Sequence, residues 1–294
     1  MNSGFISLLL PTRGRPQLVE RLFKSIRETT HQLDRIEVVL YVDEDDAPSH
    51  CLADEVLQVV RIVGPPDTMG AYNTKCLERA RGDIIMLAND DMVMRTGGWD
   101  DRLRQVDLEF ADKIYLAYGN DLFKNRAWCT FPVLSRRTCE LLAEPYPPVY
   151  RGAFIDSHLV DIFQRLQKAG EPRIRYLPDV IFEHLHYRVG KGAFDETYQR
   201  RDRFKDDPTF VSLAGTRKSG ARRLLRVIHG ESPGASDLTP SNPCTAESIA
   251  GAVILYTRIF LLDKDLPIRW RAFLWYWFVG RYVAARGWLG PLRR

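Results

Sequence analysis

The sequence predicts an α/β fold: a mixed, mostly parallel sheet flanked by helices, with a helical appendage at the C-terminus. In the first 91 residues, short apolar runs alternate with segments whose apolar residues recur at helical spacing, and each run ends in Pro, Gly, Asn or Asp. Strands joined through helices form parallel pairs with right-handed crossovers. With 294 residues, 45% of them hydrophobic, the chain can bury one large core and a smaller attachment.

Four strands are expected in these first 91 residues: the first, second and fourth are followed by polar clusters, and the third by Gly64-Pro-Pro66. In the first helix between them, Leu18, Leu22 and Ile26 lie on one face, which would pack against the sheet. Ligands of open α/β sheets bind at the C-terminal ends of the strands, where the polar clusters lie. The expected strands cover 5–10, 36–42, 57–63 and 83–88, and the helices 17–29 and 69–81.

The later part of the chain is less regular. The polar stretch 188–218 contains several Gly and is typical of a mobile loop, and 229–247 is typical of a linker rich in Gly, Ser and Pro. We expect a catalytic domain over 1–228 and a helical segment over 248–294. The remaining elements are strands over 114–118, 130–135 and 181–187 and an amphipathic helix over 156–168.

Charge and cysteine content narrow the class of protein. A net charge of +4 gives no indication of nucleic acid as a partner. The five cysteines are scattered and include no Cys-x-x-Cys pair, which is typical of reduced thiols rather than of a disulfide framework or a zinc site. The N-terminus lacks the basic region of a signal peptide, and no stretch reaches the roughly 18 apolar residues of a spanning helix. We expect a cytoplasmic protein.

The segments that follow the first two strands are candidates for binding a nucleotide. Pro11, Thr12 and Arg13 form a turn that can offer backbone N–H groups and a guanidinium to a nucleotide, or be a turn with no ligand. Asp43 and Asp45 lie in the run Asp43-Glu-Asp-Asp46. A carboxylate there can accept an N–H from a base edge, or belong to a solvated turn.

The sharpest candidate site follows the strand over 83–88. Asn89, Asp90 and Asp91 concentrate hard oxygen ligands, which suit Mg²⁺ or Mn²⁺ bridging a diphosphate, although an Asp pair that caps a helix has the same composition. His184 and His186 lie two residues apart on an expected strand, so both would face the same way, as ligands or as ordinary histidines.

Asp156 begins the expected helix over 156–168. A carboxylate there can be a helix N-cap or a general base that deprotonates an acceptor hydroxyl. The chain lacks the G-x-x-x-x-G-K-[ST] and G-x-S-x-G motifs, which disfavours P-loop and α/β-hydrolase chemistry.

Over roughly 5–198, the order and spacing of these clusters resemble the family 2 inverting glycosyltransferases of GT-A fold. That family has a first strand ending in a Pro-Thr turn, a second ending in an Asp that meets the uracil, a helix with a central Asn, a D-x-D signature and a Glu-Asp-x-x-Leu motif. The matching segments here are Ile6-Ser-Leu-Leu-Leu-Pro-Thr-Arg13, Val42-Asp43, Gly70-Ala-Tyr-Asn73, Asn89-Asp90-Asp91 and Ile155-Asp156-Ser-His-Leu159.

The resemblance implies transfer of a sugar, with inversion, from a nucleotide diphosphate sugar to a hydroxyl of a glycan, glycolipid or protein. Asp43 favours a UDP-sugar as the donor. Asp156 would be the catalytic base and Asp91 the ligand of Mn²⁺ or Mg²⁺. Asn89 would lie on the ribose side, with Asn73, Asp45 and Asp90 also at the donor, and a late histidine, His184 or His186, would contact the metal or the diphosphate.

Two positions depart from the family pattern. Asn89 replaces the first carboxylate of the D-x-D signature, which lowers the negative charge of the metal site, and Ile155 replaces the Glu before the base. Arg188 and Lys191, beside two glycines, are candidates for a lid over the diphosphate, or are solvated loop charges. The alternatives are a nucleotidyltransferase on a similar sheet and a degenerate nucleotide-binding or membrane scaffold protein.

The C-terminal segment combines aromatic residues with arginine. Between Leu266 and Arg294 there are six Arg and no acidic residue, and the Trp and Tyr residues there suit a lipid headgroup boundary. The segment is therefore expected to dock on an anionic membrane surface, at the inner face of the membrane, or to pack on the catalytic domain or another subunit of a homo-oligomer.

Overall fold

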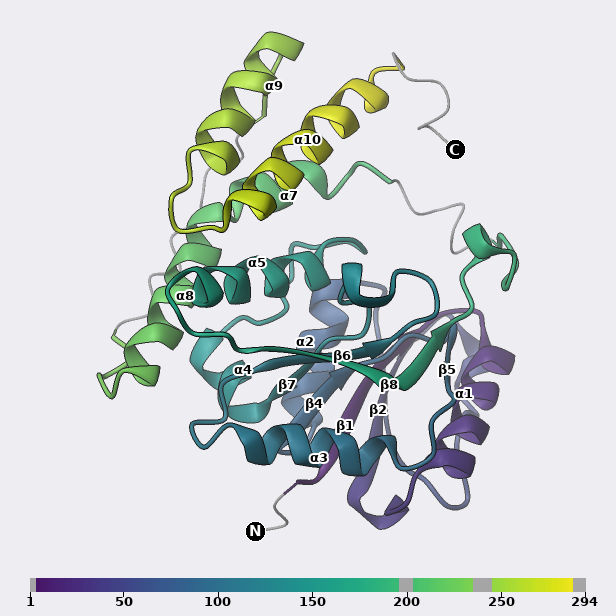
Figure 1. Ribbon diagram of the computed structural model, residues 1–294. Helices are drawn as coiled ribbons and strands as arrows, with labels where there is room; N and C mark the ends of the chain where they lie inside the picture. Colours follow the sequence, from purple (N-terminus) through teal and green to yellow (C-terminus); the bar gives the residue numbers. More distant parts are fainter. Residues whose placement is uncertain (1–3, 196–202, 235–244, 288–294) are drawn as a thin grey trace. The chain divides into compact units, whose positions relative to one another are not determined.

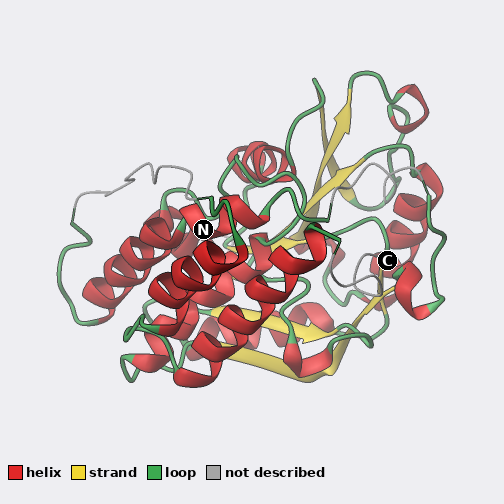
Figure 2. Ribbon diagram, turned by 90° about the horizontal axis from the view of Figure 1, so that it is seen from above, coloured by secondary structure: helices red, strands yellow, loops and turns green. Residues whose placement is uncertain are grey.

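The computed structural model describes residues 4–195, 203–234 and 245–287 (Figure 1). The chain divides into two compact units. The first comprises Met1–Ser157 and Ile174–Arg201, and the second comprises His158–Arg173 and Asp202–Arg294. The eight strands belong to the first unit, whereas the described residues of the second form helices and loops (Figure 2).

The first unit is built on one mixed sheet with the strand order β3-β2-β1-β4-β7-β6-β8-β5. β1 pairs in parallel with β2 and β4, β2 with β3, and β6 with β8, whereas β7 runs antiparallel to β4 and β6, and β5 antiparallel to β8. The strands are β1 (Ile6–Thr12), β2 (Ile36–Asp43), β3 (Gln58–Gly64), β4 (Ile84–Leu87), β5 (Met92–Met94), β6 (Leu116–Asn120), β7 (Val133–Ser135) and β8 (Ile174–His184).

The central strands are apolar because both faces of the sheet are covered. Every residue of β1 and β2 is buried, as expected for parallel strands between two helical layers. Ile6, Leu8 and Leu10 of β1 pack in one core cluster with residues of α1 and α3, while α2 contacts β1 and β2 and contributes no residue to that cluster. The helices of the first unit are α1 (Pro16–Thr29), α2 (Met69–Arg79), α3 (Trp99–Glu109) and α4 (Arg136–Leu142).

The predicted fold class, a mostly parallel mixed sheet with flanking helices, is confirmed, and β1–β4 lie within two residues of the expected ranges. The late strand, expected over 181–187, has different bounds in the structure. β8 already begins at Ile174 because it pairs along β6, and it ends at His184, so His186 lies beyond the strand. The three-residue β5 was not expected.

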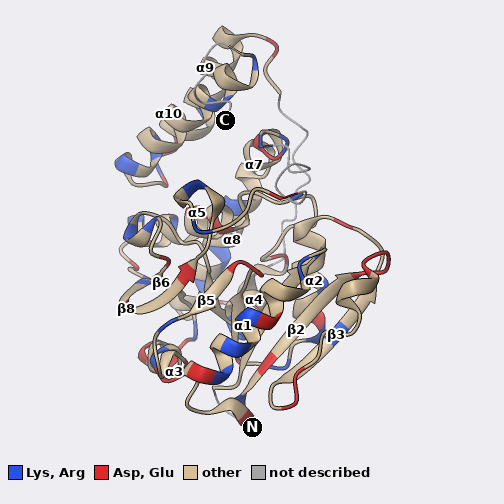
Figure 3. Cartoon of the chain, turned by 90° about the vertical axis from the view of Figure 1, so that its right-hand side faces the viewer, with Lys and Arg blue, Asp and Glu red and all other residues tan. Residues whose placement is uncertain are grey.

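The second unit is helical and continues from α5 (Ile155–Lys168), whose first turn belongs to the first unit. Part of the stretch expected to be a loop, 188–218, forms α7 and the start of α8, whereas its residues 196–202 lie outside the described residues. Most of α9 and α10 consists of residues other than Lys, Arg, Asp and Glu (Figure 3). The elements are α7 (Asp207–Ser212), α8 (Ala214–Ile228), α9 (Ile249–Tyr256) with the π-helical turn Thr257–Leu261, and α10 (Ile268–Ala285).

A buried ion network holds the second unit together. Asp161 of α5 accepts hydrogen bonds from Arg217 Nε at 2.9 Å, from Arg165 Nη2 at 3.0 Å and from the Trp270 indole at 3.0 Å. Arg165 also donates to Asp263 at 2.9 Å, before α10. Arg217, which lies in the stretch expected to be a loop, is therefore paired inside a helical unit.

Candidate functional site

The turn after β1 meets the end of β4 because the two strands pair in parallel. Thr12 Oγ1 donates to Asp90 Oδ2 at 2.9 Å, and Arg15 Nη1 donates to Asp90 Oδ1 at 3.0 Å. Asp90 is buried, and this burial raises its pKa to about 6, with the charge of Asp91 adding to the shift and that of Arg15 opposing it. Two of the predicted donor-side residues, Thr12 and Asp90, are thus in direct contact.

A second contact joins the same turn to the end of β2. The guanidinium of Arg13 donates one hydrogen bond to the carboxylate of Asp43 and two to that of Asp45, of 2.7 and 2.8 Å. Tyr72 of α2 donates its hydroxyl to Asp43 at 2.6 Å. Arg13, Asp43 and Asp45, which the sequence assigned to the nucleotide, are therefore neighbours, while Pro11 is a residue of β1 paired with Tyr41.

The two predicted asparagines lie apart from these contacts. Asn73 is buried in α2 and donates its side-chain N–H to the carbonyl of Met69 at 2.9 Å, so its amide supports the helix. Asn89 is exposed just after β4, and its backbone carbonyl accepts the backbone N–H of Met92 at 3.1 Å.

Asp91 and His184 meet because β5 pairs antiparallel with β8. His184 Nε2 lies 3.2 Å from Asp91 Oδ2, and the backbone N–H of Leu185 donates to the carbonyl of Asp91 at 2.8 Å. Both residues are buried, at 8% exposure for His184 and 6% for Asp91. The structure thus brings together two of the three residues predicted to bind metal.

His186 lies beside this pair. It is the N-cap of a 3₁₀ turn, Tyr187–Val189, and its Nδ1 accepts the backbone N–H of Arg188 at 3.1 Å. Its ring centroid lies 4.9 Å from that of His184, and the ring also stacks on Phe123. One ring nitrogen of His186 is therefore engaged with the backbone.

The Asp91–His184 pair fits a divalent cation. Neighbouring ligands of an octahedral ion with bonds of about 2.1 Å are roughly 3 Å apart, close to the separation of the two side-chain atoms. The other ring nitrogen of His184, Nδ1, is buried and has no hydrogen-bond partner, but it points away from Asp91 and would not bind the same cation as Nε2. Mg²⁺ and Mn²⁺ sites with one or two protein ligands take their remaining ligands from substrate phosphates and water.

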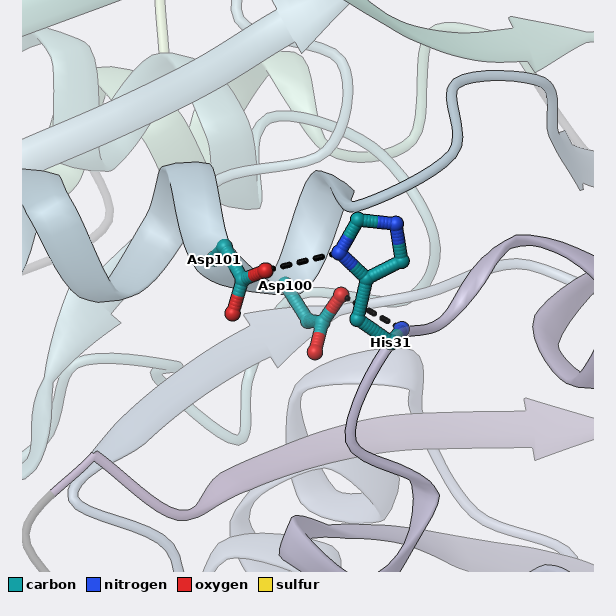
Figure 4. A group of neighbouring side chains, drawn as sticks. All are labelled: His31, Asp100 and Asp101. Atoms are coloured by element: carbon teal, nitrogen blue, oxygen red, sulfur yellow. Dashed lines mark hydrogen bonds and ion pairs between the residues drawn. The ribbon is translucent and has the colours of Figure 1, made fainter.

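Among the described residues, one group of three side chains also has the spacing of a metal site, and it lies elsewhere in the unit. His31, Asp100 and Asp101 gather where α1 ends and α3 begins (Figure 4). Asp100 is fully buried and accepts the backbone N–H groups of His31 and Gln32. Arg104 adds a further bond to Asp100 at 2.7 Å. These bonds tie two helix ends together and explain the cluster without an ion.

Asp156 lies in the first turn of α5, and its carboxylate has donors on both oxygens. Oδ1 accepts the backbone N–H of Ser157 at 2.6 Å and the Ser157 hydroxyl at 3.1 Å. Oδ2 accepts the indole N–H of Trp128 at 2.5 Å. These bonds hold both oxygens of the carboxylate in place.

The segment after β8 is held by two ion pairs. Lys191 Nζ lies 2.6 Å from Glu183 Oε1, and Glu183 also pairs with Arg95. Asp195 accepts two bonds from Arg15, of 2.6 and 2.7 Å. Of the two predicted lid cations, Lys191 is thus paired with a residue of β8, and Arg188 donates to the Tyr187 hydroxyl at 3.1 Å.

The sequence analysis missed Arg15, Trp128 and Asp195. Arg15 carried a signal: it is the N-cap of α1, where the helix dipole disfavours a cation unless anions lie nearby. Trp128 follows the segment Lys124-Asn-Arg-Ala127, and nothing in that segment indicated its contact with Asp156, which is 28 residues away. Asp195 carried no signal, because its partner lies 180 residues away.

No protein-family model and no curated protein matches the chain. The solved structures that resemble it include glycosyltransferases. A mannosyltransferase from Pyrobaculum calidifontis, in complex with GDP-Man and Mn²⁺, is 15% identical, with a TM-score of 0.46 over 97% of this chain and 76% of that one. S. aureus TarS 1–349 with UDP-GlcNAc is 12% identical, with a TM-score of 0.49 over 94% and 89%; this chain spans 53% of a longer TarS structure.

Glucosyl-3-phosphoglycerate synthase from Mycobacterium tuberculosis, in complex with Mn²⁺, UDP and phosphoglyceric acid, is 16% identical. Its TM-score is 0.42 over 63% of this chain and 73% of that one. These likenesses concern the arrangement of the chain and carry no information on its donor, acceptor or metal.

Proposed function

We propose that the chain is an inverting, metal-dependent glycosyltransferase that moves a sugar from a UDP-sugar to a hydroxyl group of a glycan, glycolipid or protein. The observation that carries the proposal is the Asp91–His184 pair, in which Oδ2 and Nε2 have the spacing of two neighbouring ligands of one cation at the end of the central sheet. Asp156, with donors on both oxygens, lies in the same unit.

The donor would lie across the ends of β1, β2 and β4. Asp43 would accept an N–H of the uracil, next to Arg13 and Asp45, and Arg15 would face the diphosphate beside Thr12 and Asp90. Asp91 and His184 would hold Mn²⁺ or Mg²⁺, with His186 next to them. The cation would supply positive charge that stabilises the departing diphosphate. Asn89, exposed at the end of β4, would lie on the ribose side.

Asp156 would act as the general base. Its carboxylate takes the proton of the acceptor hydroxyl while that oxygen forms a bond to the anomeric carbon. The bond from the anomeric carbon to the diphosphate breaks with its electron pair moving to the diphosphate oxygen. Because the oxygen attacks opposite the leaving group, the configuration inverts. Arg188 and Lys191 would move from their present partners to close over the diphosphate.

The test is a donor assay with identification of the products. The chain is incubated with Mn²⁺ and UDP- or GDP-sugars, and the released nucleotide is identified. Release of a nucleoside diphosphate with free or transferred sugar supports the proposal. Release of pyrophosphate from a nucleotide triphosphate and a sugar phosphate would instead establish a nucleotidyltransferase, and absence of turnover with intact nucleotide binding would favour the degenerate scaffold.

For the second unit, we propose docking on an anionic membrane surface, with a subunit interface as the alternative. Large apolar side chains are exposed on α9, α10 and the segment that joins them: Tyr276 at 76%, Ile268 at 67%, Leu262 at 63% and Ile254 at 54%. Arg258 and Arg269 lie exposed among them and would meet anionic headgroups. None of the helices in the described part of the chain has the length and apolarity needed to cross a bilayer.

A further inference from the structure

Trp128 belongs to a loop that joins β6 to β7 and ends against the start of α5. Its indole N–H donates to Asp156 Oδ2 at 2.5 Å, and its ring is only partly exposed. No residue between Lys124 and Trp128 belongs to a strand, so the loop itself must be rigid if the indole is to hold a fixed position.

Asp121 gives the loop that rigidity. Its Oδ1 accepts three successive backbone N–H groups, of Phe123, Lys124 and Asn125, at 2.7 to 3.0 Å. Its Oδ2 accepts the hydroxyl of Thr130 at 2.6 Å, which closes the loop on the far side of Trp128. Asp121 is 1% exposed, so these bonds are shielded from water.

The same loop is tied to the metal side of the unit. The backbone N–H of His184 donates to the carbonyl of Asp121 at 3.0 Å, and the ring of Phe123 stacks on that of His186. One loop therefore contacts both β8, which carries His184, and the carboxylate of Asp156. This fixes the position of the indole relative to the cation ligands.

We propose that Trp128 is the positioning residue of the catalytic base: its indole N–H fixes the carboxylate of Asp156 in the orientation that receives the acceptor proton. The inference rests on the role proposed for Asp156. Ser157 holds Oδ1 and Trp128 holds Oδ2, so the carboxylate plane is set by donors on both sides. Trp128 takes no proton and forms no bond in the reaction.

The orientation matters because proton transfer requires the base within hydrogen-bond reach of the hydroxyl in a near-attack geometry. Without the indole, the Asp156 side chain can turn about its terminal torsion, which is broad. When the residue that holds a catalytic group is itself held in place, the group is misaligned less often and the reaction is slowed less. The donor-binding residues Thr12, Asp43 and Asp91 form none of their described hydrogen bonds with Trp128, so donor affinity is not expected to depend on it.

The test is a double-mutant cycle with Trp128→Phe and Asp156→Asn. Phe keeps an aromatic ring but lacks the N–H. We expect kcat of Trp128→Phe to fall roughly 10- to 100-fold, the effect of losing a hydrogen bond to a charged group, with the donor KM changed less than about twofold. In the Asp156→Asn background, Trp128→Phe should cause no further loss, because the two act as a unit.

Two further variants separate positioning from general damage. Thr130→Val loosens the loop closure without touching the indole, and should lower kcat less than Trp128→Phe and only when Asp156 is present. Trp275→Phe removes an equivalent indole bond, to Thr257 in the second unit, and should leave kcat unchanged. If Trp128→Phe does not fold, the cycle is completed with Thr130→Val.

The outcomes are distinct. A kcat of Trp128→Phe within about twofold of the parent, or an equal loss in both backgrounds, overturns the positioning role. A near-normal kcat of Asp156→Asn alone would overturn the proposed base. Trp128 would then have no base to position, and the failure would be that of the proposed function.

Discussion

Arg15 and Asp195 are 180 positions apart in the sequence and form two hydrogen bonds, of 2.6 and 2.7 Å. Nη1 of Arg15 donates a hydrogen bond to Asp90, so the guanidinium is surrounded by carboxylates at the end of the central sheet. The bidentate contact with Asp195 has the geometry with which arginine also binds a phosphate. In the proposed site, a donor diphosphate would compete with Asp195 for Arg15.

The first prediction follows from this competition. Asp195→Asn keeps the size of the side chain but removes the competing charge, so the Kd of UDP with Mn²⁺ should fall about threefold to tenfold, the effect of roughly 1 kcal/mol for a partly exposed pair. Isothermal titration measures it. Asp179→Asn, which loses an exposed pair with Arg102 elsewhere on the first unit, is the matched control and should leave Kd unchanged. Weaker binding in Asp195→Asn would mean that Asp195 supports the site.

The second prediction concerns the cation ligands. Asp91→Ala should abolish the Mn²⁺-dependent part of UDP-sugar binding with the fold intact, and His184→Ala should weaken it more than His186→Ala, because only His184 lies against Asp91. Calorimetric titrations with and without EDTA measure the difference. Asp101→Ala, from the cluster at His31, serves as the control. Undiminished affinity in Asp91→Ala would remove it from the metal site.

The third prediction concerns the base. Asp156→Asn keeps the shape of the side chain but cannot accept a proton, so kcat should fall roughly 10²–10⁴-fold with the donor Kd nearly unchanged. Rapid-quench assays of sugar transfer, with the donor Kd from calorimetry, provide both values. His158 and Asp161 are poor substitutes, since both are buried. Burial, together with Arg217, also lowers the pKa of His158 well below its usual value. A near-normal kcat would move the base elsewhere in the first unit.

The sheet could be predicted because the spacing of apolar residues along the sequence reflects which residues are buried. The apolar runs of β1 and β2 are buried along their whole length, so the pattern and the structure report the same property. The sequence also predicted that Asp91 and one of two histidines, His184 or His186, would lie together, and only the pairing of β5 with β8 shows that His184 is the one against Asp91. Choosing between Arg13 and Arg15 was beyond it, because both lie in one turn and only the tertiary contacts show that Arg13 meets Asp43 whereas Arg15 meets Asp90.

The helices of the second unit show where composition misleads. The polar stretch that includes Arg217 resembles a solvated loop, yet Arg217 is fully buried because Asp161 compensates its charge. Pairing across 56 positions cannot be recognised from local pattern, so a helical segment was expected to be a loop. The expected mobile loop over 188–218 was wrong for its last part, where α7 and α8 lie.

The fourth prediction concerns the stability of this network. Burial alone would raise the pKa of Asp161, but the charges of Arg217 and Arg165 outweigh it and hold the pKa below its usual value. Because the folded-state pKa lies below the unfolded one, about 3.9, the carboxylate stabilises the fold fully above that pH and loses this contribution as the pH falls through its folded-state value.

Asp161→Asn should therefore lower the free energy of unfolding by about 3–5 kcal/mol at pH 7, because it leaves the buried guanidinium of Arg217 without its carboxylate partner, whereas Arg165 keeps Asp263. The difference from the parent should shrink below about pH 4. Urea unfolding at pH 7, 5 and 3.5 measures it. Asp265→Asn, an exposed carboxylate before α10, should change the free energy by less than about 0.5 kcal/mol. A difference that stays constant down to pH 3.5 would contradict the assignment.

The last prediction concerns the exposed apolar residues of α9, α10 and their connection. Deleting the C-terminal segment would be a poor test, because it removes Trp270 and Asp263, which bond to the buried Asp161 and Arg165. Substituting Leu262, Ile268 and Tyr276 together by Ser leaves these bonds in place and removes apolar area from an exposed surface. If the second unit docks on lipid, the parent should sediment with vesicles that contain an anionic phospholipid at low salt, and the triple variant should remain in the supernatant.

Donor hydrolysis should be equal in the parent and the triple variant, since none of the three residues belongs to the first unit. A parent that stays in the supernatant with anionic vesicles at low salt would show that the membrane proposal is wrong. Size-exclusion chromatography with light scattering then tests the alternative, a contact between subunits. The parent should elute as an oligomer and the triple variant as a smaller species if these residues form a contact between subunits, because the exposed area that they contribute is apolar and would be buried at such an interface.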